Sequence, residues 1–409
     1  MYIFVFRPFI TFLSLLFYAS FIFLPNSRRA IRVLHRFCYV LTRIVKADNG
    51  VRTTEGQKDM LKGTILAAGI AAFSISAAVG QTWNVDKWTP PYDFTNPPQD
   101  AAYAALEKAS KKWKLCVIFP HLKDPYWVAT NHGVVAHAQK IGVALDLYEA
   151  GGYPNLEKQK QQLLDCANGD YDAILLGTVS FDQMTPTVVE AAKKKPVFAT
   201  VNAIMPDGIS GMAAVDWHDM GRAAGRYFSE KYPAGSASAK VAWLPGPEAA
   251  GWVKFTDKGF REVVKDSSIE LVTVKFGDTG KEIQQKLVED VLDEHPDVDY
   301  IAGNAVAIEV AMSVLRQRDL KDKVKLVSDY FTPAIYRGIR RGLISSAPTD
   351  SAALQGMISV DQAVRFLEGS VEADHVGPAI FNVNKDNAQS FALEESLAPS
   401  DFTPTFKVD

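Results

Sequence analysis

The strongest constraint on the fold is an alternation of short apolar runs with helix-like segments along most of the chain. Runs such as 114–119 and 172–176 fit buried strands, and segments such as 125–140 fit amphipathic helices. Strands that alternate with helices of ~10–15 residues are typical of βαβ units, which build a parallel sheet. The pattern restarts at 239–244 and ends with a helix at 351–369. We therefore expect two α/β units in tandem.

These units predict two doubly wound parallel-sheet lobes joined by a hinge. Two segments are assigned to each lobe: 114–217 and 350–372 to lobe 1, and 218–349 and 373–409 to lobe 2. The region before them, 81–113, is rich in proline and aromatic residues at its start and is predicted to form an extended arm and then a helix at 101–112. In such sheets the ligand binds outside the carboxyl ends of the strands.

The first eighty residues carry targeting signals. Residues 3–24 are apolar enough to span a bilayer and are followed by basic side chains, so 1–59 is an apolar and then basic extension. A second start at Met60 opens a short charged segment, an apolar core and small residues, which is the layout of a signal peptide over 60–80. We expect Met60 to be the working start. In either case the body leaves the cytoplasm, and we expect it in the periplasm.

Charge and cysteine usage exclude several classes of function. The 409 residues include 44 basic and 47 acidic side chains, but the first 80 hold ten basic and three acidic ones, so the body is acidic. An acidic body argues against nucleic-acid binding, which needs a basic face. Three cysteines are too few for a disulfide framework or a multi-cysteine zinc site. We expect Cys116 and Cys166 to be buried free thiols, although the periplasm could oxidise them.

Aromatic and acidic residues gather where the predicted strands end. They are Asp124, Tyr126 and Trp127 after the first strand, Asp216 and Trp217 after the strand at 212–215, Asp329 and Tyr330 after the strand at 324–328, and Trp252 at the start of a helix. Several aromatic faces with few polar groups form a cage that suits a quaternary-ammonium-like head, at ~0.5–2 kcal/mol per ring. Three rings fall short of the ~8 kcal/mol of a micromolar complex, so hydrogen bonds and methyl burial must add to them.

The order of several short motifs resembles that of the ribose-class (type I) periplasmic binding proteins. The run Asp-Pro-Tyr-Trp-Val at 124–128 is similar to an Asn-Pro-Phe-Phe run of that family. Segments 258–261, 302–304 and 327–329 fall where the family has its Gly-Phe, Asn and Gly-Phe-Asp landmarks. The resemblance implies a type I periplasmic-binding-protein fold, with the ligand in the cleft between the lobes.

The aromatic residues narrow the resemblance to a branch of the family that senses trimethylamine N-oxide for a membrane sensor histidine kinase. This resemblance implies a cage of Tyr126, Trp127, Trp217 and Tyr330, with Asp124 matching the acidic residue before the proline, the kinase as partner and no cofactor. Sugar-binding relatives have an Asp-Arg pair after the fourth strand. This chain has Val201-Asn202 there, which departs from sugar recognition.

The oxygen of trimethylamine N-oxide needs a hydrogen-bond donor, because leaving it unpaired in a dry cleft would cost ~1–3 kcal/mol. The sequence offers Asn202, the indole N–H of Trp127 or Trp217, and Lys254. It does not choose among them.

No motif indicates an enzyme. The glycine spacing of a phosphate-binding loop occurs at 246–251, but Trp252 and Val253 stand where Lys and Ser or Thr are required. His132 and His137 lie five residues apart on a predicted helix and do not converge on a metal. One alternative is an ABC-transporter substrate-binding protein for a sugar or a quaternary amine, because one fold serves both tasks. Another is a membrane-anchored α/β enzyme, which requires both that 1–59 be retained and that the fold assemble a catalytic triad that no motif reveals.

Overall fold

The structure is a computed structural model that describes residues 81–390 and 392–409. The predicted extension at 1–59 and the signal peptide at 60–80 lie outside these residues. The chain divides into two units, and the unit Val79–Asp409 contains all the elements described below. Across the described ranges, no helix is both long enough and apolar enough to span a membrane.

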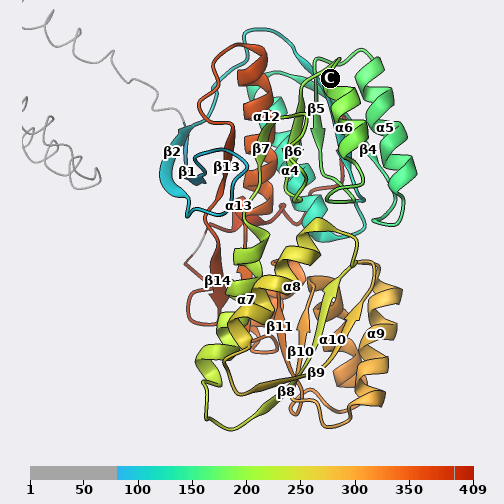
Figure 1. The fold of residues 1–409 in the computed structure, drawn as a ribbon, viewed down its shortest axis with the longest axis vertical. Helices are drawn as coiled ribbons and strands as arrows, with labels where there is room; N and C mark the ends of the chain where they lie inside the picture. Colours follow the sequence, from blue (N-terminus) through green and yellow to red (C-terminus); the bar gives the residue numbers. More distant parts are fainter. Residues whose placement is uncertain (1–80, 391) are drawn as a thin grey trace, which may run out of the picture. The chain divides into compact units, whose positions relative to one another are not determined.

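Lobe 1 is built on a nine-stranded sheet (Figure 1). Its strands are β1 (Thr82–Lys87), β2 (Gln99–Ala104), β3 (Lys114–Phe119), β4 (Ala144–Glu149), β5 (Ala173–Leu176), β6 (Val197–Thr200), β7 (Ile209–Ala213), β13 (His375–Pro378) and β15 (Lys407–Val408). They are ordered β15-β4-β3-β5-β6-β7-β13-β1-β2, and the pairs from β4 to β13 are parallel. The helices of this lobe are α4 (Pro125–Ile141), α5 (Leu156–Asn168), α6 (Thr185–Ala192) and α12 (Ala352–Leu367).

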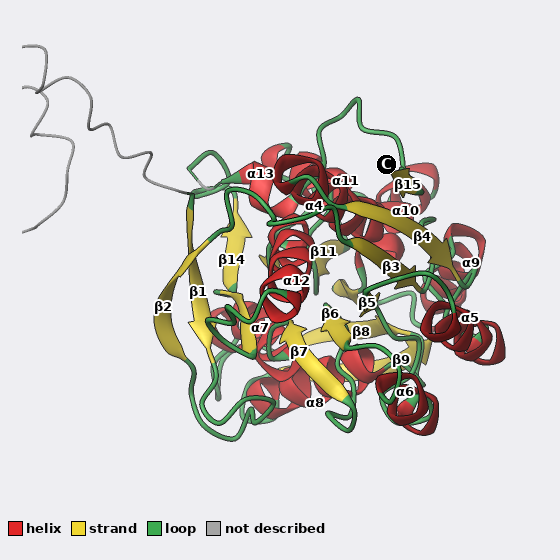
Figure 2. Cartoon of the chain, turned by 90° about the horizontal axis from the view of Figure 1, so that it is seen from above, coloured by secondary structure: helices red, strands yellow, loops and turns green. Residues whose placement is uncertain are grey.

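The central strand β3 is buried on both faces, as expected for a strand of a doubly wound sheet. Leu115 and Val117 pack in the same cluster as Val134 of α4. Cys116 points the other way, because successive side chains alternate across a strand, and packs with Leu163 of α5. Figure 2 shows α12 beside α4 over one part of the sheet. Helices α5 and α6 lie away from that pair, over a different part of the sheet.

Lobe 2 is built on a four-stranded parallel sheet with the order β11-β10-β8-β9. Its strands are β8 (Ala239–Gly246), β9 (Ile269–Phe276), β10 (Tyr300–Gly303) and β11 (Lys325–Ser328), and its helices are α7 (Trp217–Lys231), α8 (Gly251–Val264), α9 (Lys281–Glu294), α10 (Ala305–Gln317) and α11 (Pro333–Arg340). A small antiparallel pair, β12 (Ser346–Thr349) and β14 (Phe381–Asn384), lies next to it. The chain crosses between the lobes after β7, between β12 and α12, and between β13 and β14. The predicted α/β fold of two parallel-sheet lobes is confirmed.

The N-terminal arm and the C-terminal tail differ from the prediction. β2 covers part of 101–112, and no helix forms there among the described residues. The Tyr103 ring stacks on Trp83 and its hydroxyl donates to Asp361 of α12, so tertiary contacts override the helix propensity of this alanine-rich segment. Within 373–409, β13 pairs with β7 and β15 pairs with β4, so these strands belong to lobe 1 and not to lobe 2. Local sequence cannot show which sheet a short strand joins, because cross-strand partners decide it.

The two cysteines of lobe 1 are not free thiols. Cys116 of β3 and Cys166 of α5 form a disulfide, with their Cα atoms 6.0 Å apart. The expectation of free thiols is therefore wrong, because the parallel crossover places α5 directly on β3. A disulfide is typical of an oxidising compartment such as the periplasm.

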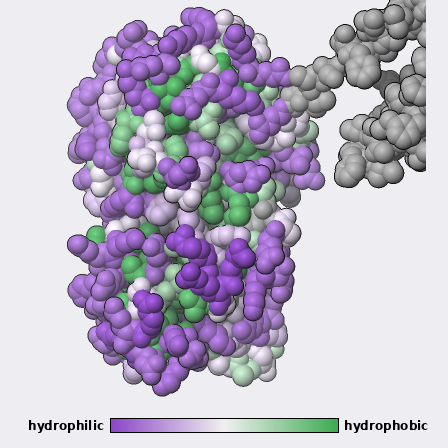
Figure 3. Space-filling model, turned by 180° about the vertical axis from the view of Figure 1, so that it is seen from behind, coloured by the Kyte–Doolittle hydropathy of each residue, from purple (hydrophilic) through white to green (hydrophobic). Residues whose placement is uncertain are grey.

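Helices α7 and α8 approach closely enough to need glycine. A Cβ atom at Gly221 would lie 2.0 Å from the carbonyl oxygen of Thr256, and one at Gly259 would lie 2.0 Å from that of His218. The two helices therefore pack backbone to backbone where Gly221 meets Thr256 and where Gly259 meets His218. Seen from behind, the surface is mostly hydrophilic, and apolar side chains form only small groups (Figure 3).

Candidate functional site

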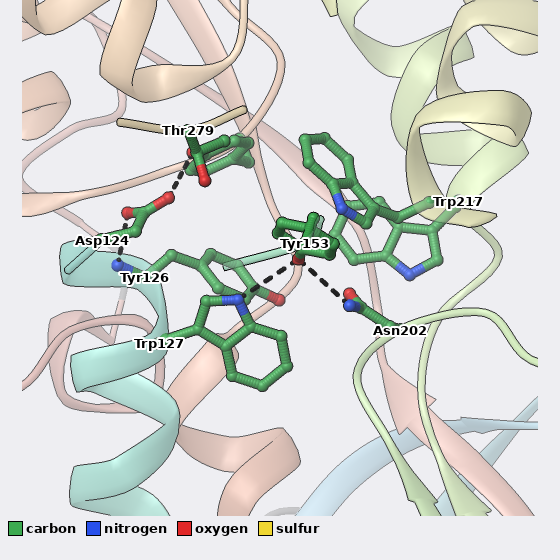
Figure 4. A pocket seen from close by; sticks show the side chains of 9 residues that line it. Asp124, Tyr126, Trp127, Tyr153, Asn202, Trp217 and Thr279 are labelled. Atoms are coloured by element: carbon green, nitrogen blue, oxygen red, sulfur yellow. Dashed lines mark hydrogen bonds between the residues drawn. The ribbon is translucent and has the colours of Figure 1, made fainter. Parts of the chain in front are cut away.

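A pocket of about 250 Å³ is lined by residues from both lobes (Figure 4). Its lining is Asp124, Tyr126, Trp127, Tyr153, Asn202, Trp217, Trp252, Thr279 and Tyr330. This volume includes space open to solvent, so the room enclosed between the side chains is smaller and suits at most a ligand of few heavy atoms. Six of the nine lining residues are aromatic, which makes the walls broad and apolar.

Local structure brings the rings to one place because each lies at a helix start or a strand end. Asp124 caps α4 and accepts from the Tyr126 N–H, and Pro125 opens the helix, so Tyr126 and Trp127 fall in its first turn. Asp216 caps α7 in the same way and places Trp217 first in that helix. Elsewhere in the site, Trp252 is the second residue of α8, and Tyr330 follows β11.

Four of the rings close a circuit. The ring centroids of Tyr126 and Trp217 are 6.5 Å apart, those of Trp217 and Trp252 are 5.6 Å apart, and the Trp252–Tyr330 and Tyr330–Tyr126 pairs are 5.8 and 5.4 Å apart. Tyr126 lies in lobe 1 and the other three belong to lobe 2, so the circuit spans both lobes. All four were candidate site residues, but the predicted cage had Trp127 where the circuit has Trp252; Trp127 lines the pocket outside the circuit.

Tyr153 is a pocket residue that the sequence reasoning missed. Its hydroxyl oxygen accepts from Trp127 Nε1 at 3.3 Å and from Asn202 Nδ2 at 3.1 Å (Figure 4). Burial raises the pKa of Tyr153, so the hydroxyl keeps its proton at neutral pH. The Tyr153 oxygen is the acceptor in both hydrogen bonds, so the hydroxyl proton remains available to a further acceptor. Tyr153 lies just after β4, so the rule applied to the other strands would have found it.

The donors proposed from the sequence are mostly occupied. Asn202 Nδ2 also donates to the carbonyl oxygen of Thr178, and Trp217 Nε1 donates to that of Val201. Lys254 is exposed, lies outside the pocket and has its Nζ 5.5 Å from the Phe181 ring centroid, so it is not a site residue. Trp252 Nε1 is buried and has no hydrogen-bond partner within the described part of the chain.

Two cage tyrosines bind buried carboxylates. Tyr330 Oη donates to Asp124 Oδ2 at 2.6 Å, and Tyr126 Oη donates to Asp350 Oδ2 at 2.6 Å. Burial raises the pKa of Asp124 to about 6, although the hydrogen bonds from Tyr330 and the Tyr126 N–H oppose the rise. Burial also raises the pKa of Asp350. Asp350 is a second residue that the sequence reasoning missed, since it lies far along the chain.

Contacts between the loops after β3 and β9 also join the lobes. Lys123 Nζ lies 2.5 Å from Asp278 Oδ2, and His121 Nε2 lies 3.1 Å from the Thr279 hydroxyl. Burial lowers the pKa of His121 to about 4, so the ring is neutral. Together with the Asp124–Tyr330 bond, these contacts hold the pocket closed over its interior.

Two of the predicted aspartates lie outside the pocket. Asp216 acts as the cap of α7. Asp329 is 1% exposed, and neither of its carboxyl oxygens has a hydrogen-bond partner among the described residues. Burial raises the pKa of Asp329 well above its usual range, with a further rise from the nearby Asp124 charge. Burial therefore favours the uncharged form of this side chain. In the same part of the chain, no cluster of His, Cys, Asp and Glu could hold a metal ion.

Asp329→Asn is expected to flatten the dependence of stability on pH. The folded-state pKa is raised, so above pH ~3.9 the unfolded chain releases a proton that the folded chain keeps, and stability falls by about 1.4 kcal/mol per pH unit until the folded-state pKa is passed. The asparagine variant lacks this term. Thermal unfolding of both proteins at pH 5 and pH 8 measures the difference, and equal slopes would contradict the assignment. Ligand binding should be unchanged, because Asp329 does not line the pocket.

Comparisons with known proteins point in one direction. A family profile described as "Periplasmic binding protein domain" matches residues 115–370. The Escherichia coli (strain K12) protein described as "Periplasmic protein TorT" is 37% identical over 301 residues, which are 73% of this chain and 86% of that protein.

Two solved structures are also similar. One is an ABC transporter solute binding protein from Bradyrhizobium sp. BTAi1 with bound bis-tris, with 45% identity and a TM-score of 0.69, covering 79% of this chain and 98% of the other. The second is the complex of the TorS sensor domain with TorT in the presence of TMAO, with 40% identity and a TM-score of 0.66, covering 72% of this chain and all of the matched one. These are binding and sensor proteins, in agreement with the predicted absence of enzymatic activity.

Proposed function

The chain belongs to the periplasmic binding protein family, and we propose that it senses trimethylamine N-oxide (TMAO) in the periplasm and passes the signal to the sensor domain of a TorS-type histidine kinase. The observation that carries this proposal is the closed circuit of four aromatic rings beside a hydroxyl with a free proton. The kinase partner is inferred from the relatives of this chain. TorT is 37% identical to this chain and occurs in complexes with the TorS sensor domain.

The rings suit the trimethyl end of the ligand. The nitrogen of TMAO is positive and its methyl groups are apolar, so the negative faces of Tyr126, Trp217, Trp252 and Tyr330 attract it at ~0.5–2 kcal/mol per ring. Asp124 lines the same pocket and adds negative charge when it is ionised. Burial of the methyl groups adds ~0.8 kcal/mol for each carbon removed from water.

Tyr153 suits the oxygen end. Its hydroxyl accepts from Trp127 and Asn202, so its own proton is available for donation to the ligand oxygen. The unpartnered Trp252 N–H is a second donor at the same pocket. A hydrogen bond to a charged acceptor contributes ~1.5–3 kcal/mol, and added to the rings this reaches the range of a micromolar complex.

A titration of the secreted protein tests the ligand. We expect saturable binding of TMAO, followed by tryptophan fluorescence and calorimetry, and none of ribose at the same concentrations. Glycine betaine, a quaternary amine with a carboxylate, should bind more weakly because its charged arm exceeds the closed pocket. Preferential binding of ribose would overturn the proposal.

The kinase part of the proposal has its own test. If the partner recognises the ligand-bound shape, linkage requires that the TorS sensor domain change TMAO affinity by the same factor as TMAO changes affinity for that domain. Equal TMAO affinity with and without the sensor domain would contradict signalling while leaving ligand binding intact.

A second candidate is a transport receptor that delivers a small amine to an ABC permease. The 45% identity to an ABC transporter solute binding protein with bound bis-tris favours it, because bis-tris is an amine with polar arms. The same cage would then serve uptake. A binding profile in which bis-tris or a quaternary amine outcompetes TMAO would favour this alternative.

A further inference from the structure

We propose that Asp350 is a positioning residue that strengthens the cage from outside the pocket by drawing the proton of Tyr126 toward its carboxylate and so making the Tyr126 ring more negative. This inference rests on the proposed function, because it concerns a ligand with a positive trimethyl head. Asp124 likewise accepts the hydroxyl proton of Tyr330, but Asp124 also lines the pocket. Asp350 does not, so a substitution at Asp350 tests the effect on the ring without a direct contact to the ligand.

The geometry fits a charged acceptor. Tyr126 Oη and Gln355 Nε2 both donate to Asp350 Oδ2, at 2.6 and 2.8 Å. An O–H···O distance of 2.5–2.7 Å is typical of a bond to a carboxylate, and an oxygen that receives two donors is best served by the ionised form. Helix α12 begins two residues later, at Ala352, and a helix N-terminus favours negative charge. The Asp350 side chain itself is 1% exposed and does not line the pocket.

The same arrangement on the other tyrosine indicates a shared purpose. The ring centroids of Tyr126 and Tyr330 lie 5.4 Å apart in an edge-to-face arrangement, and each tyrosine donates its hydroxyl proton to a different buried aspartate. A buried carboxylate is costly, because it is kept away from water. Phenylalanine at both positions would fill the same space and would need no carboxylate beside it. A phenol that donates to a carboxylate gains electron density in its ring, and a more negative ring face attracts a cation more strongly.

Asp350→Asn tests the inference, because asparagine can still accept from Tyr126 and keeps the size of the side chain. We expect TMAO affinity to fall about 3- to 10-fold. Binding of tert-butanol, a neutral molecule of similar shape, should change less than about 2-fold, because its affinity does not depend on ring charge. An equal loss for both ligands would show a structural role and overturn the proposal.

A double-mutant cycle separates the action through Tyr126 from other routes. In Tyr126→Phe the hydroxyl is gone, so adding Asp350→Asn should change TMAO affinity less than about 2-fold. Additive losses would overturn the proposal. Unchanged thermal unfolding in Asp350→Asn controls for folding. If the wild-type protein binds no TMAO, the proposed function fails. If it binds TMAO and the variant binds it equally, only the role of Asp350 fails.

Discussion

Replacing Tyr153 with phenylalanine is expected to weaken TMAO binding about 10- to 100-fold, because the variant loses a hydrogen bond of ~1.5–3 kcal/mol to the charged oxygen. The ring remains, so the pocket keeps its shape. The hydroxyl also accepts from Trp127 and Asn202, and Asn202 retains its second bond to Thr178. Isothermal calorimetry of the two proteins measures the change.

Tetramethylammonium provides the matched control for this variant. It carries the same positive methylated nitrogen but has no oxygen, so the Tyr153 hydroxyl cannot donate to it. Its affinity should be equal in the wild-type protein and in Tyr153→Phe. If both ligands lose affinity equally, Tyr153 shapes the pocket and does not recognise the oxygen.

Removing the Trp252 ring is expected to weaken TMAO binding to a comparable degree. Trp252 contacts both Trp217 and Tyr330 in the ring circuit, and its Nε1 has no partner in the described structure, so its loss leaves no buried acceptor unpaired. Trp252→Leu should lower TMAO affinity about 30-fold or more, because a cation–π contact, a donor and apolar contact area disappear together.

Two further variants serve as controls for Trp252→Leu. Trp252→Phe keeps an aromatic face and loses only the N–H, so its loss of affinity should be smaller than that of Trp252→Leu. Trp113→Leu removes a tryptophan that donates to Glu368 outside the pocket and should leave binding unchanged. Equal affinity of Trp252→Leu and wild type would contradict the cage.

Most of the fold followed from local pattern. Most parallel strands of the two sheets are largely buried runs followed by amphipathic helices, and such periodicity depends only on neighbours along the chain. The errors fall where distant partners decide. Residues 101–112 have helix propensity, but the pairing of β1 with β2 and the Tyr103–Asp361 hydrogen bond select a strand. The short strands β13 and β15 join lobe 1 through partners more than a hundred residues away.

The rings of the candidate site could be predicted because they obey one topological rule. Tyr126, Trp217 and Tyr330 stand at strand ends or at the helix starts that follow, and parallel strands bring those ends to a common edge. The rule does not tell which polar groups are free. Asn202, Trp127 and Trp217 are suitable donors by residue type, but the folded chain commits their N–H groups to other oxygens.

The sequence by itself therefore determined the α/β class, the two lobes and the aromatic character of the site, because periodicity and residue type are local properties. Only the tertiary structure decided that Cys116 and Cys166 are bonded, that Tyr153 lines the pocket, that Asp350 accepts from Tyr126 outside it, and that Lys254 and Asp329 do not line it. Hydrogen-bond partners and burial depend on contacts between residues that are distant in the sequence. Those contacts cannot be read from the residue types along the chain.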